Sequence, residues 1–218
     1  MSHNTVTVAY YGVAIPMSKK LSTNLVGQSV PRQWPHWLSG FAQWLMRVRG
    51  WQAEGELANR PKMVISVAPH TSNWDFFIGL FVLFALRLKV SFFGKHTLFF
   101  PPLSWVMKAI GGIPVERSRS HGMVGAIADK IKATEQLLLV LAPEGTRRPV
   151  YPWKTGFMQI AKAAGVPVQL IGFDYIKKRI IFGPVIEQVI DINQQMQTVY
   201  AFYASVTGKF PEKCRVSE

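Results

Sequence analysis

The sequence predicts an α/β fold in which a mainly parallel β-sheet is flanked by helices. From Lys62 onward, short runs of β-branched and other apolar residues alternate with longer stretches whose apolar residues recur at helical spacing. This alternation is typical of βα units, whose strands pair in parallel. The chain has 218 residues, which is long enough for one domain with a sizeable core and does not require two.

The elements of this domain, which we place at 56–218, follow one another at regular intervals. Four buried strands alternate with four helices, and a short apolar strand that follows a glycine pair, a further strand and a final helix complete the pattern. The main strands are expected at 63–68, 90–93, 137–142 and 166–172, the helices at 76–88, 102–110, 122–135 and 155–164, the glycine-led strand within 111–117, and the last strand and helix at 179–185 and 194–206.

The part of the chain before this domain divides into two segments. Residues 1–30 mix polar residues with short apolar pieces and lack the pattern of a secretory signal, so we expect a loosely ordered lead-in. Residues 31–55 predict an amphipathic helix, because apolar residues recur there at helical spacing and share one face. That face carries Trp34, Trp37, Leu38, Phe41, Trp44, Leu45, Val48 and Trp51.

The tryptophans of this segment favour a helix that lies on a membrane surface. Indole rings are enriched at membrane–water boundaries, whereas a buried helix uses Leu and Ile more often. The alternative is a helix that packs its apolar face on the domain core. We predict membrane contact through Trp34, Trp37, Phe41, Trp44 and Trp51.

Charge and composition restrict the class of partner. The 25 Lys and Arg against 12 Asp and Glu give a formal net charge of +13, which predicts an anionic partner such as phospholipid, nucleic acid or a phosphorylated small molecule. The longest uncharged apolar run, 76–86, would reach about 16 Å as a helix, whereas a bilayer-spanning helix needs roughly 20 apolar residues. The single cysteine, Cys214, can form no internal disulfide.

The strongest local signal is the segment 68–75, which lies directly after a predicted strand and before a predicted helix. Its His70 and Asp75 are five residues apart across a turn, so the carboxylate can accept a proton from one ring nitrogen while the other nitrogen takes a proton from a hydroxyl. This is a base with its orienting group, without a protein nucleophile. The alternative is a surface turn in which Asp75 caps the following helix.

A second constellation follows the buried strand within 137–148. The strand ends in a Pro and Gly turn that presents Glu144, Arg147 and Arg148 at its carboxyl end. Arginines in such a position can hold a phosphate through paired hydrogen bonds. A simple salt bridge between Glu144 and Arg147 is the alternative. The basic end of the segment 111–117 adds Arg117 as a further cation.

In this order, the three stretches resemble the motif blocks of the glycerophospholipid acyltransferases, the family of the bacterial lysophosphatidate acyltransferases. His70 and Asp75 match the family's His-x4-Asp block, residues 112–117 match its glycine-to-arginine block, and residues 144–147 match its Glu-Gly-Thr-Arg block. The similarity covers roughly half the chain, from about Val64 to Val168, with further support from 94–95, 154–157 and the proline-centred 165–168.

The resemblance implies a fold like that of the glycerol-3-phosphate acyltransferases and an O-acyltransferase activity. The expected enzyme moves a fatty acyl group from acyl-CoA or acyl carrier protein to the free hydroxyl of a lysophospholipid, with 1-acylglycerol-3-phosphate as the expected acceptor. His70 is the expected general base and Asp75 its orienting group. The expected substrate-binding residues are Arg117, Glu144, Gly145, Thr146 and Arg147, and the accessory candidates are Asn73, Lys95, Arg148 and Lys154.

The expected partners are an anionic membrane surface, the lysolipid and the acyl donor, with the protein peripheral or monotopic on the cytoplasmic face. No bound cofactor is expected, and no nucleic acid, because no recognised binding motif is present. No metal is expected, because the remaining histidines, His3, His36, His96 and His121, lack ligand spacing. Two alternatives stay open. One is an acyltransferase for another lysolipid, such as lyso-ornithine lipid, and the other is a non-enzymatic basic module that binds membrane or nucleic acid.

Overall fold

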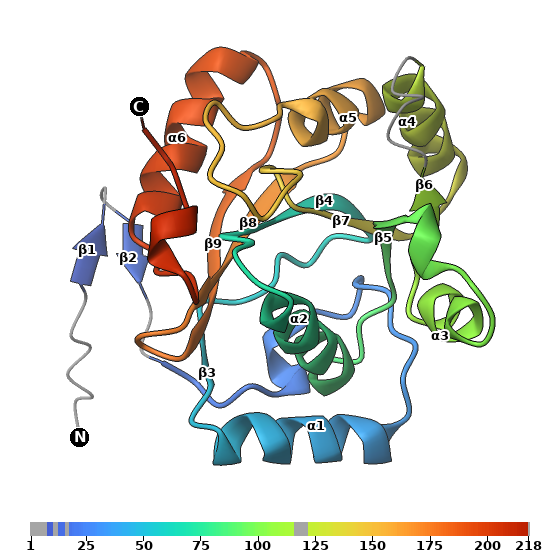
Figure 1. Cartoon of the computed structure of the whole chain (residues 1–218), viewed down its shortest axis with the longest axis vertical. Helices are drawn as coiled ribbons and strands as arrows, with labels where there is room; N and C mark the ends of the chain where they lie inside the picture. The colour runs from blue at the N-terminus through green and yellow to red at the C-terminus, as the bar shows by residue number, and fades with distance from the viewer. Residues whose placement is uncertain (1–7, 11–12, 16–17, 116–121, 218) are drawn as a thin grey trace.

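A seven-stranded sheet forms the centre of the computed structural model, which describes residues 8–10, 13–15, 18–115 and 122–217 (Figure 1). The strand order is β3-β9-β8-β4-β7-β5-β6. Strands β4 to β8 pair in parallel, whereas β9 is antiparallel to β8 and parallel to β3. The strands are β3 (Gln52–Glu54), β4 (Lys62–Ala68), β5 (Val90–Lys95), β6 (Gly112–Val115), β7 (Leu137–Leu141), β8 (Val168–Asp174) and β9 (Arg179–Ile186), and a separate antiparallel pair joins β1 (Val8–Tyr10) to β2 (Val13–Ile15).

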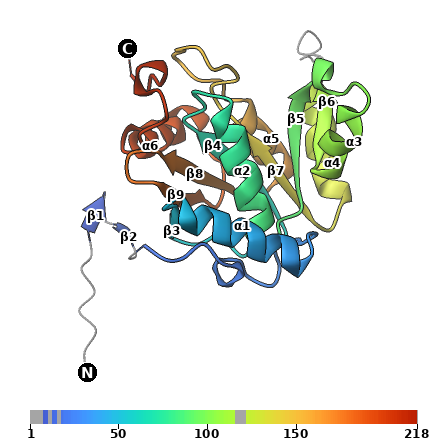
Figure 2. The ribbon, with the colours of Figure 1, turned by 60° about the horizontal axis from the view of Figure 1, so that its bottom comes forward.

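Helices lie on both sides of the sheet (Figures 1 and 2). One side carries α1 (His36–Val48), α2 (Trp74–Ala85) and α3 (Leu103–Ala109), and the other carries α4 (Met123–Ala133), α5 (Gly156–Ala164) and α6 (Ile192–Ala204). Short 3-10 turns are found at Thr23–Leu25, His96–Leu98 and Pro211–Lys213. In the described part of the chain, no helix combines the length and the apolar character that crossing a membrane requires.

The sheet is buried on both faces, which explains the nearly continuous apolar runs of its central strands. Along β4, Met63 and Ile65 enter the core on the side of α1 and α2, while Val64 and Ala68 enter the core on the other side. Because successive side chains of a strand point to opposite faces, one strand serves both cores. All seven residues of β8 are buried.

The predicted α/β fold with a mainly parallel sheet is confirmed. Each strand and helix predicted from Lys62 onward is present in the described residues, with bounds that differ by a few residues. The segment before the domain differs from the prediction in two ways. Residues 18–30 are packed, since Leu21, Leu25 and Val26 are buried in the core, so this part is not a loose lead-in. The helix predicted within 31–55 is limited to α1, and β3 follows it after a short turn.

Helix α1 turns its aromatic side chains outward. Trp37, Phe41 and Trp44 are exposed by 74%, 52% and 51%. The inner face carries the buried residues Ser39, Ala42 and Met46. It also makes polar contacts: the Ser39 hydroxyl donates to the Ala85 carbonyl of α2 at 2.7 Å, and Gln43 Nε2 donates to the same oxygen at 2.9 Å. The polar residue Gln43 therefore faces the domain, where it satisfies a carbonyl at the end of α2 that no helical amide reaches.

Two of the five tryptophan and phenylalanine residues predicted to touch a membrane make contacts within the domain. Trp51 is buried and packs edge-on against Tyr175, because α1 ends at Val48 and the chain turns inward through Gly50, whose φ is +80°. Trp34 is half-buried and donates its indole N–H to the Leu88 carbonyl at 3.0 Å. The membrane-contact prediction is wrong for Trp51, and Trp34 has its polar atom bound inside the protein.

Candidate active site

The two motif segments meet at the carboxyl edge of the parallel strands. Strands β4 and β7 are neighbours, with Ser66 paired to Leu141. The turn that carries His70 follows β4 and leads into α2, and the loop that carries Glu144 and Arg147 follows β7, so both lie at the same end of the sheet (Figure 2). In open α/β sheets, this edge is the usual position of binding sites.

His70 and Asp75 face each other across the turn. Nδ1 of His70 lies 3.6 Å from Oδ2 of Asp75, within ion-pair distance. The side chain of Asp75 is 2% exposed, and its Oδ2 accepts the amides of Thr71 at 2.8 Å and Ser72 at 2.7 Å. The carboxylate thus reaches back to organise the turn. Asp75 is buried and lies beside the imidazole, so its role is not limited to capping the following helix.

The electrostatic surroundings keep the imidazole neutral. Burial lowers the pKa of His70 below its ordinary value, the Asp75 charge acts in the opposite direction, and the Arg147 charge lowers this pKa further. Nε of Arg147 lies 3.4 Å from Nε2 of His70, to which it donates. This contact, with Asp75 beside Nδ1, leaves the proton on Nδ1 and the lone pair on Nε2. A neutral imidazole with that tautomer can accept a proton from a hydroxyl.

Glu144 contacts the turn of His70. It is 4% exposed, and both of its carboxylate oxygens accept the backbone N–H of His70, at 2.9 and 3.0 Å. Burial raises the pKa of Glu144 to about 7. The predicted role for Glu144 was substrate binding, and a simple salt bridge with Arg147 was the alternative. The geometry ties the loop after β7 to the loop after β4, and substrate binding by Glu144 stays a prediction.

Replacing Glu144 by glutamine should flatten part of the pH dependence of stability. Because its pKa is raised in the folded state, the stabilisation by Glu144 is fully present below about pH 4.5 and is lost as the pH rises through about 7. The lowered pKa of His70 acts with the opposite sign, so stability from that group rises with pH just below 6.5. Urea unfolding between pH 5 and pH 8 should show the wild type losing up to about 3 kcal/mol relative to Glu144→Gln.

The exposed residue Glu187 provides the control for this measurement. Glu187 pairs with Arg60 on the surface, so Glu187→Gln should keep the wild-type pH dependence within about 1 kcal/mol. A Glu144→Gln protein with the same slope as the wild type would show that Glu144 is ionised throughout this range.

Three of the predicted substrate-binding residues, Gly145, Thr146 and Arg147, belong to the loop after β7. Arg147 is exposed apart from its contact with His70, and Thr146 Oγ1 accepts the Arg148 amide at 3.2 Å. Gly145 has a φ of +63° and lies under the Lys154 side chain, where an added Cβ would approach Lys154 Cδ to 3.3 Å. Glycine therefore suits this turn for both its conformation and its lack of a side chain.

Other predicted residues are less closely associated with the pair. Asn73 and Lys154 are exposed, Lys95 is the last residue of β5 at the same edge, and Arg117 lies outside the described residues. A contact that the sequence did not predict comes from Tyr175, whose hydroxyl donates to Oδ1 of Asp75 at 2.7 Å. Within the described ranges, no three His, Cys, Asp or Glu side chains lie together as a metal site requires.

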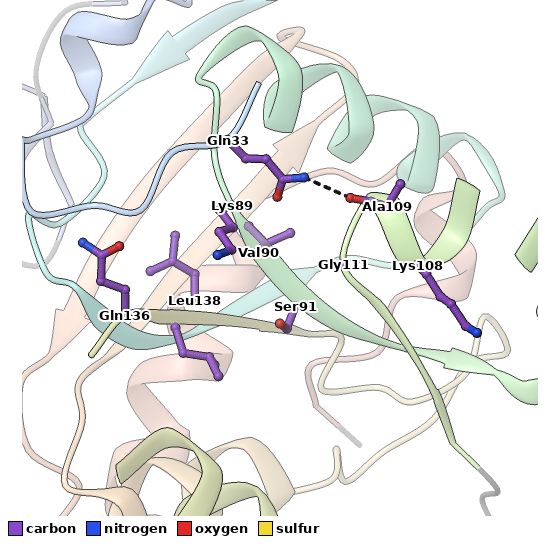
Figure 3. Close-up of a pocket in the computed structure, with 10 residues that line it drawn as sticks. Gln33, Lys89, Val90, Ser91, Lys108, Ala109, Gly111, Gln136 and Leu138 are labelled. Atoms are coloured by element: carbon purple, nitrogen blue, oxygen red, sulfur yellow. Dashed lines mark hydrogen bonds between the residues drawn. The ribbon is translucent and has the colours of Figure 1, made fainter. Parts of the chain in front are cut away.

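A cavity of about 370 Å³ lies away from this site, at the amino-terminal edge of the sheet (Figure 3). Val90 and Leu137 begin β5 and β7, and Gly111 precedes β6, so the cavity opens where these parallel strands start. Figure 3 shows Gln33 donating Nε2 to the Ala109 carbonyl, at 3.3 Å. The cavity is lined by Gln33, Lys89, Val90, Ser91, Lys108, Ala109, Gly111, Gln136, Leu137 and Leu138, none of which belongs to the motif blocks around His70 and Glu144.

Known proteins resemble the chain in sequence and in fold. The 1-acyl-sn-glycerol-3-phosphate acyltransferases of Salmonella typhimurium and Escherichia coli strain K12 are each 30% identical to this chain over an alignment of 114 residues. The alignment covers 48% of this chain and 44% of each relative. The chain thus matches less than half the length of these relatives. The crystal structure of the 1-acyl-sn-glycerophosphate (LPA) acyltransferase PlsC from Thermotoga maritima superposes with a TM-score of 0.52 at 16% identity, over 78% of this chain and 75% of that one, which shows a common fold.

The family assignment follows from a match that includes the whole site described above. The family model described as Acyltransferase matches residues 52–173, more than half of the chain. This range begins at β3, includes His70, Asp75, Glu144 and Arg147, and ends within β8. The resemblance drawn from the motif blocks is therefore confirmed, and the chain belongs to the acyltransferase family.

Proposed function

We propose that this protein transfers a fatty acyl group from a thioester to the free hydroxyl of a lysophospholipid, with 1-acylglycerol-3-phosphate as acceptor and His70 as general base. The observation that carries the proposal is a single imidazole between a buried carboxylate and an exposed guanidinium, 3.6 Å from Asp75 and 3.4 Å from Arg147. A base and an anion-binding group are thereby adjacent, as the acylation of a phosphate-bearing alcohol requires.

The reaction proceeds without an acyl-enzyme. Nε2 of His70 takes the hydroxyl proton as the acceptor oxygen bonds to the thioester carbonyl carbon. The tetrahedral intermediate collapses, the carbon–sulfur bond breaks, and the thiolate leaves with the proton from the imidazolium. Asp75 stabilises the imidazolium through Nδ1. The amides of His70, Thr71 and Ser72 all donate to buried carboxylates, so these three do not serve as oxyanion donors.

Arg147 binds the phosphate of the acceptor in this proposal. Its guanidinium is exposed and positively charged, and its contact with Nε2 of His70 is long for a hydrogen bond. A phosphate dianion is a stronger partner for guanidinium than a neutral imidazole, because paired N–H donors match its oxygens. Phosphate binding therefore draws Arg147 from Nε2 and frees the lone pair for the acceptor hydroxyl.

We also propose that α1 brings the protein to an anionic membrane surface, where the acceptor and the acyl donor partition. Trp37, Phe41, Trp44 and Val48 are spaced along one face of α1, and each is more than half exposed. Arg47 and Arg49 are exposed at the end of the helix. Interfacial aromatic groups and basic residues are two separate contributions that combine into firm, reversible binding.

Product analysis tests the proposed reaction. Purified protein is incubated with labelled acyl-CoA or acyl carrier protein and with 1-acylglycerol-3-phosphate, monoacylglycerol or lyso-ornithine lipid, and the products are identified by mass. We expect 1,2-diacylglycerol-3-phosphate as the main product. Acylation of lyso-ornithine lipid alone would refute the proposed acceptor, and no acylation with either donor would refute the proposed function.

Arg147→Gln should selectively weaken the use of the phosphate-bearing acceptor. Loss of a charge-assisted contact is expected to raise KM for 1-acylglycerol-3-phosphate by about 10-fold or more, with a smaller change for monoacylglycerol. Because the Arg147 charge lowers the pKa of His70, its removal should also move the acid limb of kcat/KM to higher pH. Arg60→Gln, which removes a surface arginine paired with Glu187, is the control. Equal KM changes for both acceptors would exclude phosphate binding by Arg147.

A further inference from the structure

Asp75 also receives a hydrogen bond from outside its own motif. The Tyr175 hydroxyl donates to Oδ1 at 2.7 Å, a length typical of a charge-assisted bond. The other oxygen, Oδ2, accepts the Thr71 and Ser72 amides and faces His70 Nδ1. The carboxylate is thus held at both oxygens, and only one of them is directed to the imidazole.

The hydroxyl is held in place by a rigid part of the fold. Tyr175 follows β8 directly, and its amide donates to the Thr207 carbonyl at 2.9 Å. Its ring packs edge-on against the buried Trp51, with centroids 5.2 Å apart. The preceding residue, Asp174, is fully buried and accepts the Lys177 amide at 2.7 Å. The turn after β8 therefore holds the hydroxyl against Asp75.

We propose that Tyr175 is a positioning residue for the catalytic pair: its hydroxyl fixes the rotation of the Asp75 carboxylate so that Oδ2 faces Nδ1 of His70. This inference rests on the proposed function of His70 as general base. Without the hydroxyl, Oδ1 keeps only the Ser72 hydroxyl, at 3.4 Å, so the carboxylate loses its strongest restraint at Oδ1 while the Thr71 and Ser72 amides still bind Oδ2. Burial and the Asp75 carboxylate raise the pKa of Tyr175, so the hydroxyl stays protonated and remains a donor at working pH.

The proposal assigns the positioning role to the hydroxyl of Tyr175 and only a packing role to its ring. Tyr175→Phe removes only the oxygen, and the phenyl ring still packs against Trp51, so the fold is retained. A purely structural tyrosine would then change neither the turnover nor the titration of His70. A positioning residue changes both. Without the Tyr175 hydroxyl, the negative charge of Asp75 is less neutralised by hydrogen bonds, so the carboxylate stabilises the His70 imidazolium more strongly.

Steady-state kinetics of Tyr175→Phe test the inference. We expect kcat to fall on the order of 10-fold to 100-fold with KM for the acceptor nearly unchanged, because the alignment of the base is impaired and binding is not. The acid limb of kcat/KM should move to higher pH. In the Asp75→Asn background, the same substitution should have little further effect, since the two residues act as one unit.

Tyr203→Phe is the matched control for Tyr175→Phe, because it also removes a single tyrosine hydroxyl. Its hydroxyl donates to the Ser66 carbonyl at 2.7 Å, in the core below the site. The melting temperature should fall, while the acid limb should stay in place.

The outcomes distinguish the positioning role from the proposed function. If His70→Ala abolishes acyl transfer but Tyr175→Phe leaves kcat and the acid limb unchanged, the positioning role is wrong and the function stands. Should no acceptor be acylated even by the wild type, the proposed function fails, and NMR titration of the His70 imidazole decides the role of Tyr175 separately. A rise in this pKa in Tyr175→Phe supports the role, and an unchanged pKa refutes it.

Discussion

His70→Ala should lower kcat for acyl transfer by about 10²-fold to 10⁴-fold, the usual contribution of a positioned base. The imidazole is half-buried, with a side chain 25% exposed, and its ring contacts Asp75 and Arg147 at the edge of the sheet, away from the main core. Its removal should therefore leave the fold and liposome binding intact. Stopped assays with 1-acylglycerol-3-phosphate, together with circular dichroism, measure both quantities.

The pH profile makes this prediction more specific. Because burial lowers the pKa of His70 below 6.5, kcat/KM of the wild type should rise with pH through an apparent pKa on the acid side of that value. His36→Ala is the matched control, since His36 is exposed on α1 and contacts Arg87, and it should keep the wild-type rate and profile. Unchanged turnover in His70→Ala would remove the imidazole from the mechanism.

The sequence predicted the sheet because its strands carry a local signal. Residues 137–141 are apolar throughout, and residues 168–174 are apolar apart from Gln169, Gly172 and Asp174, as expected for strands covered on both faces, and the intervening helices show helical spacing. The His-x4-Asp block was recognisable for a similar reason, since both residues belong to one turn. Where a structural unit is contiguous in the chain, its pattern is visible in the sequence.

Contacts between distant segments could not be predicted in this way. Glu144 binds the amide of a residue 74 positions earlier, and Tyr175 binds a carboxylate 100 positions earlier. A tyrosine directly after a strand has no distinguishing local pattern, and Tyr175 lies outside the motif blocks. Trp51 was misassigned because helical spacing continues past Gly50, although the positive φ of that glycine ends the helix.

The exposed aromatic residues are distributed unevenly over the molecule. Trp37, Trp44, Trp74, Phe77 and Trp105 are all exposed, and all belong to α1, α2 or α3, the helices on one side of the sheet (Figure 1). Trp74 and Phe77 are in the first turn of α2, the helix that begins beside His70. A surface that binds lipid through these three helices would therefore have the proposed site at its border, where a lysolipid arrives.

The triple substitution Trp37→Ser, Phe41→Ser and Trp44→Ser should lower the partition of the protein onto anionic vesicles by about 100-fold or more. Each aromatic side chain removed from the interface lowers the binding free energy by about 1 kcal/mol, and the three share one face of α1. The fold should be unaffected, because all three are at least half exposed and the helix is held by Ser39, Ala42 and Met46 on its inner face. Sedimentation with phosphatidylglycerol vesicles measures the partition.

A matched substitution and a series of salt concentrations distinguish a specific lipid-binding face from non-specific binding to vesicles. Ile190 is 68% exposed and lies two residues before α6, on the other side of the sheet, so Ile190→Ser should bind vesicles as the wild type does. Raising the salt concentration should weaken the electrostatic contribution of the basic residues and leave the aromatic one, because screening acts on charge alone. The triple variant should then lose nearly all binding at high salt, whereas the wild type should retain part of it. Equal binding of the triple variant and the wild type at every salt concentration would show that α1 has no part in membrane attachment.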